Sequence, residues 1–229
     1  MTKKKDFIPA LGYNWLTGLY DLTIKLTMPE RKFRAKLIDI LNPKDTESIL
    51  EFGFGTGQNI ILAYQRNSKT KFTGVDIDPK VKQIADNKKV KLGYSMNLDL
   101  YNGKTFPYTN NSFDKVFSSL VFHHLDKETK LSALKEIHRV LKPNGQLIIG
   151  DWGKAKSKTM RIAFYTVQIF DGFKTTNDNV NGLLPKYIEK VGFKNVDEMD
   201  FINTAIGTYS YYRATKEQQN ASLFQDKTV

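Results

Sequence analysis

The chain has 229 residues, of which 40% are hydrophobic and 26% charged, a composition that predicts a globular protein with a sizeable core. No apolar run approaches the roughly 18 residues that a membrane-crossing helix needs, and no apolar stretch of a secretory signal follows the N-terminal lysines. The absence of cysteine excludes disulfides, thiolate metal sites and a cysteine nucleophile. We therefore expect a cytoplasmic protein.

The net charge of +11 has two interpretations. It fits an anionic partner, such as nucleic acid or an anionic lipid surface, and it also fits a lysine-rich solvated surface. The basic residues are mostly lysine and scattered, whereas phosphate recognition favours clustered arginine. We favour the solvated surface, do not expect nucleic acid as the partner, and leave peripheral membrane contact open.

The first 45 residues predict two helices ahead of any strand. The segment 11–26 is rich in aromatic residues, and a second helix starts after Pro29. In that second helix Phe33, Leu37 and Leu41 recur at the spacing of one helical face. We expect residues 1–45 to form a helical lid over a ligand cleft or, alternatively, only a cover for one face of a sheet.

Strand and helix patterns then alternate, which predicts a mostly parallel sheet within a core of residues 46–215. The expected strands are 48–52, 71–76, 90–94, 114–119 and 146–150. The expected helices between them are 58–65, 78–87 and 127–141, with a long polar connection over 96–111.

The pattern changes after residue 150. Helices are expected over 159–170 and 183–191, followed by strands over 196–201 and 208–214 that form a closing antiparallel hairpin. Residues 216–229 are polar and are expected to be a disordered tail.

A glycine-rich turn follows the first strand. The sequence SILEFGFGTGQN, from Ser48 to Asn59, predicts a buried strand, a turn with glycine at 53, 55 and 57, and a helix. Such a turn brings backbone N–H groups close to a ligand, and glycine permits positive φ there. A dinucleotide site would need glycine at position 58, where this chain has Gln58.

Five motifs resemble class I S-adenosylmethionine-dependent methyltransferases. They are Glu51-x-Gly53-x-Gly55-x-Gly57, Gly74 to Asp78, Asn111 to Val116, Leu120 to Leu125, and Val140 to Leu147. The resemblance covers about residues 10–214 and is nearest to the methyltransferase type 11 group, which includes the ubiquinone and menaquinone methyltransferases. It implies an α/β, Rossmann-like fold, with a seven-stranded mostly parallel sheet, helices on both faces and an antiparallel last strand.

The resemblance also implies a binding site for S-adenosyl-L-methionine. Glu51 would support the methionine amino group, Asp76 the ribose hydroxyls, and Ile77 would pack against adenine. Asp99 is the candidate for the adenine amino group, with Asn97 as a competitor, while Ser119 and Leu120 would line the methionine side. The implied cofactor residues are Glu51, Gly53, Gly55, Gly57, Asp76, Ile77, Asp99, Ser119 and Leu120.

Methyl transfer needs alignment more than activation, and a general base helps only where the acceptor carries a proton. His123 and His124 lie where the family's active-site cleft begins, and either can serve as that base or have a structural role. Asp151, at the end of the fifth strand, is a second candidate base or substrate contact. No metal site is expected.

Aromatic side chains flank the expected acceptor side and favour a small-molecule or lipid-like methyl acceptor, although they also fit ordinary core packing. The substrate candidates are Tyr20, Trp152 and Tyr165. Two alternatives stay open: an RNA methyltransferase, prompted by the charge, and a non-catalytic S-adenosylmethionine-binding protein. Ser118-Ser119-Leu120 is not the Asn/Asp-Pro-Pro-aromatic tetrapeptide of enzymes that methylate exocyclic base amines.

Overall fold

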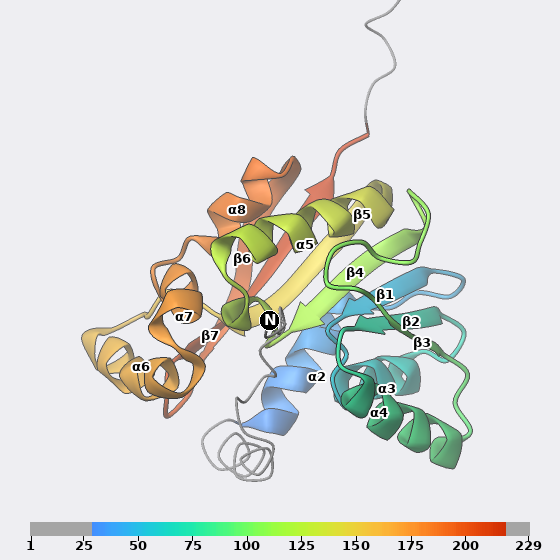
Figure 1. The fold of residues 1–229 in the computed structure, drawn as a ribbon, viewed down its shortest axis with the longest axis horizontal. Helices are drawn as coiled ribbons and strands as arrows, with labels where there is room; N and C mark the ends of the chain where they lie inside the picture. The colour runs from blue at the N-terminus through green and yellow to red at the C-terminus, as the bar shows by residue number, and fades with distance from the viewer. Residues whose placement is uncertain (1–28, 219–229) are drawn as a thin grey trace, which may run out of the picture.

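The computed structural model describes residues 29–218 (Figure 1). The helix expected over 11–26, the substrate candidate Tyr20 and all but the first residues of the expected tail lie outside these residues. Within them, no helix is both long enough and apolar enough to cross a bilayer.

Seven strands form one sheet, in the order β3-β2-β1-β4-β5-β7-β6. All neighbouring strands are parallel except that β7 runs antiparallel to both β5 and β6. This arrangement confirms the predicted fold class. The strands are β1 (Ser48–Phe52), β2 (Lys71–Asp76), β3 (Asn97–Leu100), β4 (Phe113–Ser119), β5 (Leu141–Trp152), β6 (Phe193–Asn203) and β7 (Thr208–Lys216).

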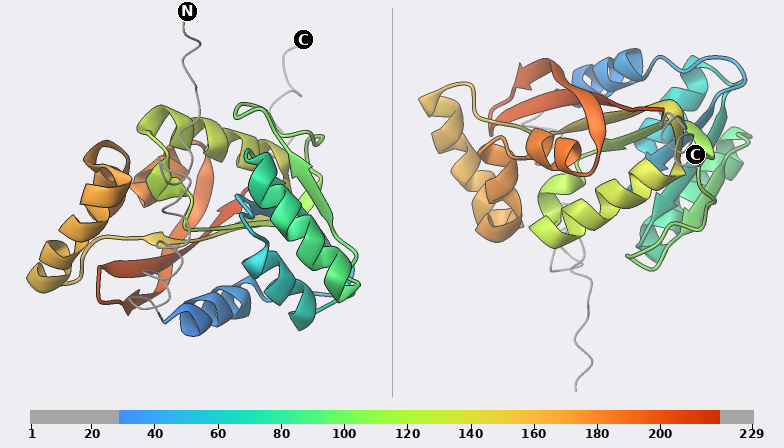
Figure 2. Two further views of the ribbon diagram at one scale, coloured as in Figure 1. Left: turned by 60° about the horizontal axis from the view of Figure 1, so that its bottom comes forward. Right: turned by 90° about the horizontal axis from the view of Figure 1, so that it is seen from above.

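Helices cover both faces of the sheet, as Figure 2 shows from above. The side chains of consecutive strand residues point to opposite faces of the sheet. Ile49 therefore packs in the core formed with α2, α3 and α4, and Leu50 packs in the core formed with α5 and α8. The helices are α2 (Glu30–Leu41), α3 (Gln58–Arg66), α4 (Pro79–Leu92), the 3-10 turn η1 (Phe122–His124), α5 (Lys127–Val140), α6 (Lys158–Asp171), α7 (Phe173–Val180) and α8 (Leu184–Lys190).

The predicted third strand over 90–94 is wrong. Residues up to Leu92 continue α4, which ends where Gly93 takes a left-handed conformation, φ 68°, and its N–H bonds to Lys89 and Val90 carbonyls. The strand lies instead at Asn97–Leu100, inside the expected polar connection. Its four residues alternate between polar and apolar, a run too short to distinguish a strand from a loop.

Strand β5 and helix α7 also differ from the prediction. Strand β5 begins at Leu141, because Phe113 pairs with Leu141 before an irregularity shifts the pairing to Lys115 with Gln146. Helix α7 was not predicted, because two of its buried residues are the polar Thr176 and Asn179. An apolar periodicity search does not detect such a helix.

The described part of the expected lid, α2, packs closely on the sheet. Phe33, Leu37 and Leu41 are buried in the core it shares with α3. The Tyr211 hydroxyl on β7 donates a hydrogen bond of 3.0 Å to the Phe33 carbonyl. This helix therefore forms one layer of the domain, and its role as a lid stays a prediction.

Candidate functional site

The glycine turn follows β1 at the carboxyl edge of the sheet. Gly53, Gly55 and Gly57 all have positive φ, at 72°, 52° and 81°. A Cβ on Gly53 would lie 2.4 Å from a Val121 methyl, whereas a Cβ on Gly55 would meet no described residue within 4 Å. The described part of the chain therefore packs against the turn at Gly53 and leaves space at Gly55, where a ligand can approach the backbone.

The Asp76 carboxylate joins this turn to the end of β2. It accepts hydrogen bonds from the backbone N–H groups of Gly55 at 2.8 Å, Ile77 at 2.7 Å and Asp78 at 3.0 Å. Burial raises the pKa of Asp76, and these hydrogen bonds oppose that rise. Helix α4 is capped by Asp78, which accepts from the Lys80 N–H, so capping does not explain Asp76.

Glu51 is completely buried in β1 and belongs to a chain of polar contacts. Its Oε1 accepts from the Asn59 amide at 3.1 Å, and the Asn59 Oδ1 accepts from Arg34 at 2.6 Å. Its Oε2 has no hydrogen-bond partner among the described residues. Burial raises the pKa of Glu51 to about 8. A cationic group beside Oε2 would satisfy this oxygen and favour the ionised form.

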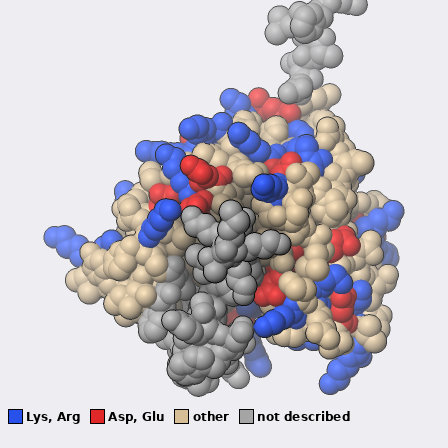
Figure 3. All heavy atoms as spheres, viewed as in Figure 1, with Lys and Arg blue, Asp and Glu red and all other residues tan. Residues whose placement is uncertain are grey.

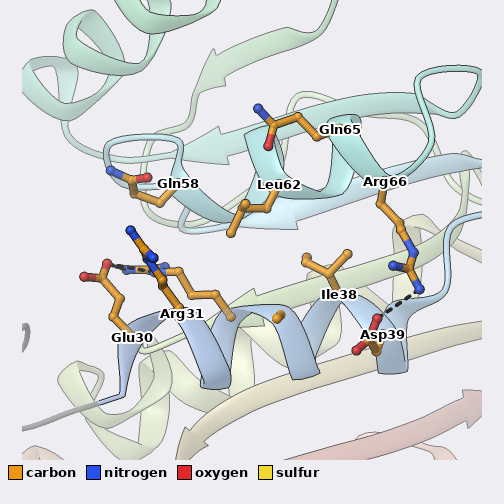
Figure 4. A pocket seen from close by; sticks show the side chains of 10 residues that line it. Glu30, Arg31, Ile38, Asp39, Gln58, Leu62, Gln65 and Arg66 are labelled. Atoms are coloured by element: carbon orange, nitrogen blue, oxygen red, sulfur yellow. Dashed lines mark hydrogen bonds and ion pairs between the residues drawn. The ribbon is translucent and has the colours of Figure 1, made fainter.

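Asn59 and Arg34 were missed by the sequence interpretation. Asn59 follows the glycine turn by two positions and Arg34 lies on α2, and no local motif connects either residue with Glu51. Arg34 also contributes to a groove of about 650 Å³ between α2 and α3 (Figure 4). The groove has an apolar floor at Ile38 and Leu62 and begins beside Gln58, the first residue of α3.

The adenine candidates lie apart from this edge. Asp99 pairs in register with Val75, inside β3, and its carboxylate accepts from the Tyr108 hydroxyl at 3.0 Å. Asn97 is exposed at the opposite end of β3. The Tyr101 N–H, just after β3, donates a hydrogen bond to the Asp76 carbonyl. Asn102 is the next residue and therefore lies closer to the carboxyl edge. Its Oδ1 accepts from the Lys104 and Thr105 N–H groups.

The end of β4 has a strained backbone. Leu120 has a positive φ of 56°, rare for a residue with a branched side chain, and its N–H bonds to the Gly150 carbonyl. The Ser119 hydroxyl lies 2.9 Å from the Tyr209 hydroxyl, and both groups are buried. Strain of this kind clusters at ligand sites, which makes the edge between β4 and β5 a candidate for the methyl-acceptor side.

The two histidines lie on η1, which Asp151 holds against the end of β5. The Asp151 carboxylate accepts from the N–H groups of Phe122, His123 and Trp152 and lies 2.7 Å from His123 Nδ1. With both oxygens engaged in the interior, Asp151 is placed to orient the His123 ring. If His123 Nδ1 carries the proton, Nε2 is the acceptor atom of the ring.

His124 lies against His123, with ring centroids 3.9 Å apart. Burial and the neighbouring His123 lower the pKa of His124 well below its usual value. Trp152 is buried beside them, 6.4 Å from His123 by ring centroids and 5.4 Å from Phe164.

Tyr165 is not brought to this site. Its side chain is 44% exposed on the outer face of α6, with the Arg161 guanidinium 4.3 Å above its ring. The preceding residue, Phe164, is the one that faces inward. Successive residues of a helix point about 100° apart, and the aromatic pair in the sequence did not indicate which of the two is buried.

The comparisons with known proteins identify the family of the chain. A family model described as a methyltransferase domain matches residues 50–149. The chain is 30% identical over 153 residues to the uncharacterized methyltransferase YrrT of Bacillus subtilis, covering 64% of this chain and 68% of that protein. It is 29% identical over 138 residues to a demethylmenaquinone methyltransferase of Bacillus velezensis, covering 59% and 58%.

A solved structure shares the fold. The Haemonchus contortus phosphoethanolamine N-methyltransferase 2, in complex with phosphomonomethylethanolamine and S-adenosylhomocysteine, superposes with a TM-score of 0.65 at 16% identity. The match covers 81% of this chain and 52% of that one.

Proposed function

The chain belongs to the S-adenosylmethionine-dependent methyltransferases, and on this premise we propose that it methylates a small-molecule or lipid-like acceptor. The acceptor class is supported by the aromatic residues around Trp152 and by one relative whose name specifies a lipid-like acceptor, demethylmenaquinone. The assignment of the cofactor site depends mainly on Glu51. Its carboxyl group is buried, and one of its oxygens has no partner among the described residues.

The residues at the carboxyl edge fit S-adenosylmethionine. Glu51 Oε2 would accept a hydrogen bond from the methionine ammonium, and the Glu51–Asn59–Arg34 contacts would hold the carboxylate in place. Asp76 would accept from ribose hydroxyls, since the Gly55 N–H holds its carboxylate at the glycine turn. When bound, the cofactor supplies a methyl group on a sulfonium that needs no further activation.

The histidines would serve the acceptor. Asp151 fixes the His123 ring through Nδ1, so Nε2 would take the proton of an acceptor hydroxyl. The buried Trp152 and Phe164 would exclude water from this side, which favours attack by the acceptor over competing hydrolysis. In this scheme His123 is the base and Asp151 is a positioning residue.

Calorimetric titration with S-adenosylmethionine tests the cofactor half. We expect binding by the wild-type chain, weaker binding by Glu51→Gln, and unchanged binding by the control Asp86→Asn, which alters a surface carboxylate on α4. Failure of the wild-type chain to bind would contradict the proposal. The acceptor is then sought by profiling metabolites and lipids in a deletion strain.

An RNA acceptor is the second candidate, favoured by the net charge of +11. Electrostatic binding to RNA would strengthen at low salt, because it releases counterions. A chain that binds S-adenosylmethionine but no RNA at low salt would remove this candidate. Cofactor binding without methylation of any extract would instead favour a non-catalytic protein.

A further inference from the structure

One face of α6 and the start of α7 carries large apolar side chains in contact with solvent. Ile162 is 67% exposed, Tyr165 44%, Ile169 70% and Phe173 52%. Ile162, Tyr165 and Ile169 recur on α6 at intervals of three and four residues, which places them on one side of the helix. Phe173 follows the break between α6 and α7 at Gly172, and its ring centroid lies 6.4 Å from that of Tyr165. We call these four residues the α6 apolar face.

The opposite side of α6 already supplies its contribution to the core. Phe164 and Val167 are buried in the core cluster, and Gln168 is buried in contact with Thr176. The α6 apolar face is thus not required for packing within the described part of the domain. Exposed apolar patches of this kind mark interaction surfaces.

Basic residues precede and flank this face. The segment from Lys154 to Arg161 contains four cationic side chains and no acidic one, and these line a shallow surface hollow that also contacts Val180. Lys156 is paired with Glu198, while Lys154 and Lys158 are exposed and form no ion pair with a described residue. This end of α6 therefore offers free positive charge next to the α6 apolar face.

The position of α6 makes this surface accessible. The helix projects at one end of the molecule, beyond the sheet (Figures 1 and 2). In the space-filling view its lobe is mainly uncharged, with Lys and Arg atoms at its rim (Figure 3).

We propose that the α6 apolar face, with Lys154 and Lys158, docks on the surface of an anionic phospholipid membrane. A helix that combines a continuous apolar face with lysines at its border lies in the interface of a bilayer, its apolar side in the acyl boundary and its cations at the headgroups. Each lysine close to an anionic surface adds attraction that salt weakens. The charge complementarity favours anionic lipid over a neutral partner.

Membrane docking is independent of which acceptor the enzyme uses. The chain passes from Trp152, at the end of β5, through the lysine segment into α6, so docking would hold the candidate acceptor side close to the membrane surface. A lipid-like acceptor would then be drawn from the bilayer, although the docking itself needs no turnover to be measured.

Cosedimentation of the full chain with vesicles tests the proposal. One set contains phosphatidylcholine alone and the other contains added phosphatidylglycerol. We expect binding to the anionic vesicles only, with loss at high salt. The double variant Ile162→Ser/Ile169→Ser should weaken this binding by about tenfold, because it removes the two most exposed residues of the face.

Two further variants separate the contributions. Lys154→Gln/Lys158→Gln should weaken binding by about tenfold and reduce its salt dependence. Ile84→Ser/Val90→Ser is the matched control, since these α4 residues are 45% and 75% exposed but lie away from α6, and it should bind like wild type. Calorimetry with S-adenosylmethionine checks that each variant is folded.

Three results would overturn the proposal. The first is no binding to anionic vesicles by the wild-type chain. The second is equal loss of binding in the α4 control. The third is a dimer in sedimentation equilibrium that Ile162→Ser/Ile169→Ser dissociates, which would assign the face to a second copy.

Discussion

The edge around the glycine turn and the surface of α6 differ in how their side chains are satisfied. At the glycine turn nearly every polar group has a bond within the protein: Asp76 accepts three backbone N–H groups, and Glu51 is linked to Arg34 through Asn59. On α6 large apolar side chains and lysines face solvent instead. The glycine turn is therefore preorganised for a small ligand. The apolar side chains of α6 that face solvent are not covered by the rest of the described chain.

Preorganised polar contacts thus follow β1, whereas exposed apolar side chains lie on α6, which follows β5. In the proposed site, S-adenosylmethionine would be held by backbone N–H groups, carboxylates and glycines, which tolerate little change. Substitutions at the glycine turn should therefore have large effects on binding, and substitutions on α6 should have small effects on it.

Asp76→Ala should weaken S-adenosylmethionine binding by more than about 100-fold. The variant removes a candidate ribose contact and leaves the backbone N–H groups of Gly55, Ile77 and Asp78 without their acceptor, each at a cost of about 1–3 kcal/mol. Calorimetry measures the loss. Asp78→Ala is the control, because it removes only the cap of α4 and should reduce stability while binding persists.

His123→Ala should lower methylation by about 100-fold while cofactor affinity stays near that of wild type. The measurement is transfer of label from S-adenosylmethionine to a lipid extract, together with calorimetry on the same protein. Asp151→Asn should lower methylation in the same direction, because it alters the partner of His123 Nδ1. Full activity of His123→Ala would contradict the role of His123 as a base and would indicate that the contact between His123 and Asp151 is structural.

Gly53→Ala should destabilise the fold by about 2 kcal/mol. The positive φ at position 53 disfavours alanine, and the new Cβ would lie too close to Val121. Gly55→Ala has room for the Cβ and should cost less stability, yet it should weaken cofactor binding because it fills the open side of the turn. Thermal unfolding and calorimetry together separate the two effects. Equal stability losses would contradict the described packing.

Cofactor affinity should rise about tenfold between pH 6.5 and 8 and then level off. In the free protein burial raises the pKa of Glu51 to about 8, so below that pH the group holds a proton. Binding of an ammonium group favours the carboxylate and releases the proton, so a lower pH opposes binding. Calorimetry across this pH range measures the slope, and Glu51→Gln should abolish it.

Tyr165→Ala should change cofactor affinity and stability very little, by less than about 0.5 kcal/mol, because its ring is exposed on α6. Trp152→Ala should instead destabilise the fold by about 3 kcal/mol, because its ring packs on Phe164 and Tyr209. Chemical denaturation compares the two variants. A large effect of Tyr165→Ala on unfolding would mean that α6 is packed differently.

The sequence alone specified the glycine turn and the two strands beside it. Strands β1 and β2 occupy the predicted residues, and the register of Gly53, Gly55 and Gly57 predicted a turn that the structure confirms. These features are local: a short apolar run bounded by glycine, or an aspartate before a proline, specifies its own backbone conformation. Their alternation with helices also predicted the parallel sheet.

Only the tertiary structure decided the rest. The partners of Glu51 come from α2 and α3, Asp151 reaches η1 from β5, and β3 is recognised by its pairing with β2. Helix α7 buries polar residues, and Tyr165 faces outward while its neighbour faces inward. These outcomes depend on contacts between segments far apart in the chain, and no local pattern of residue types contains that information.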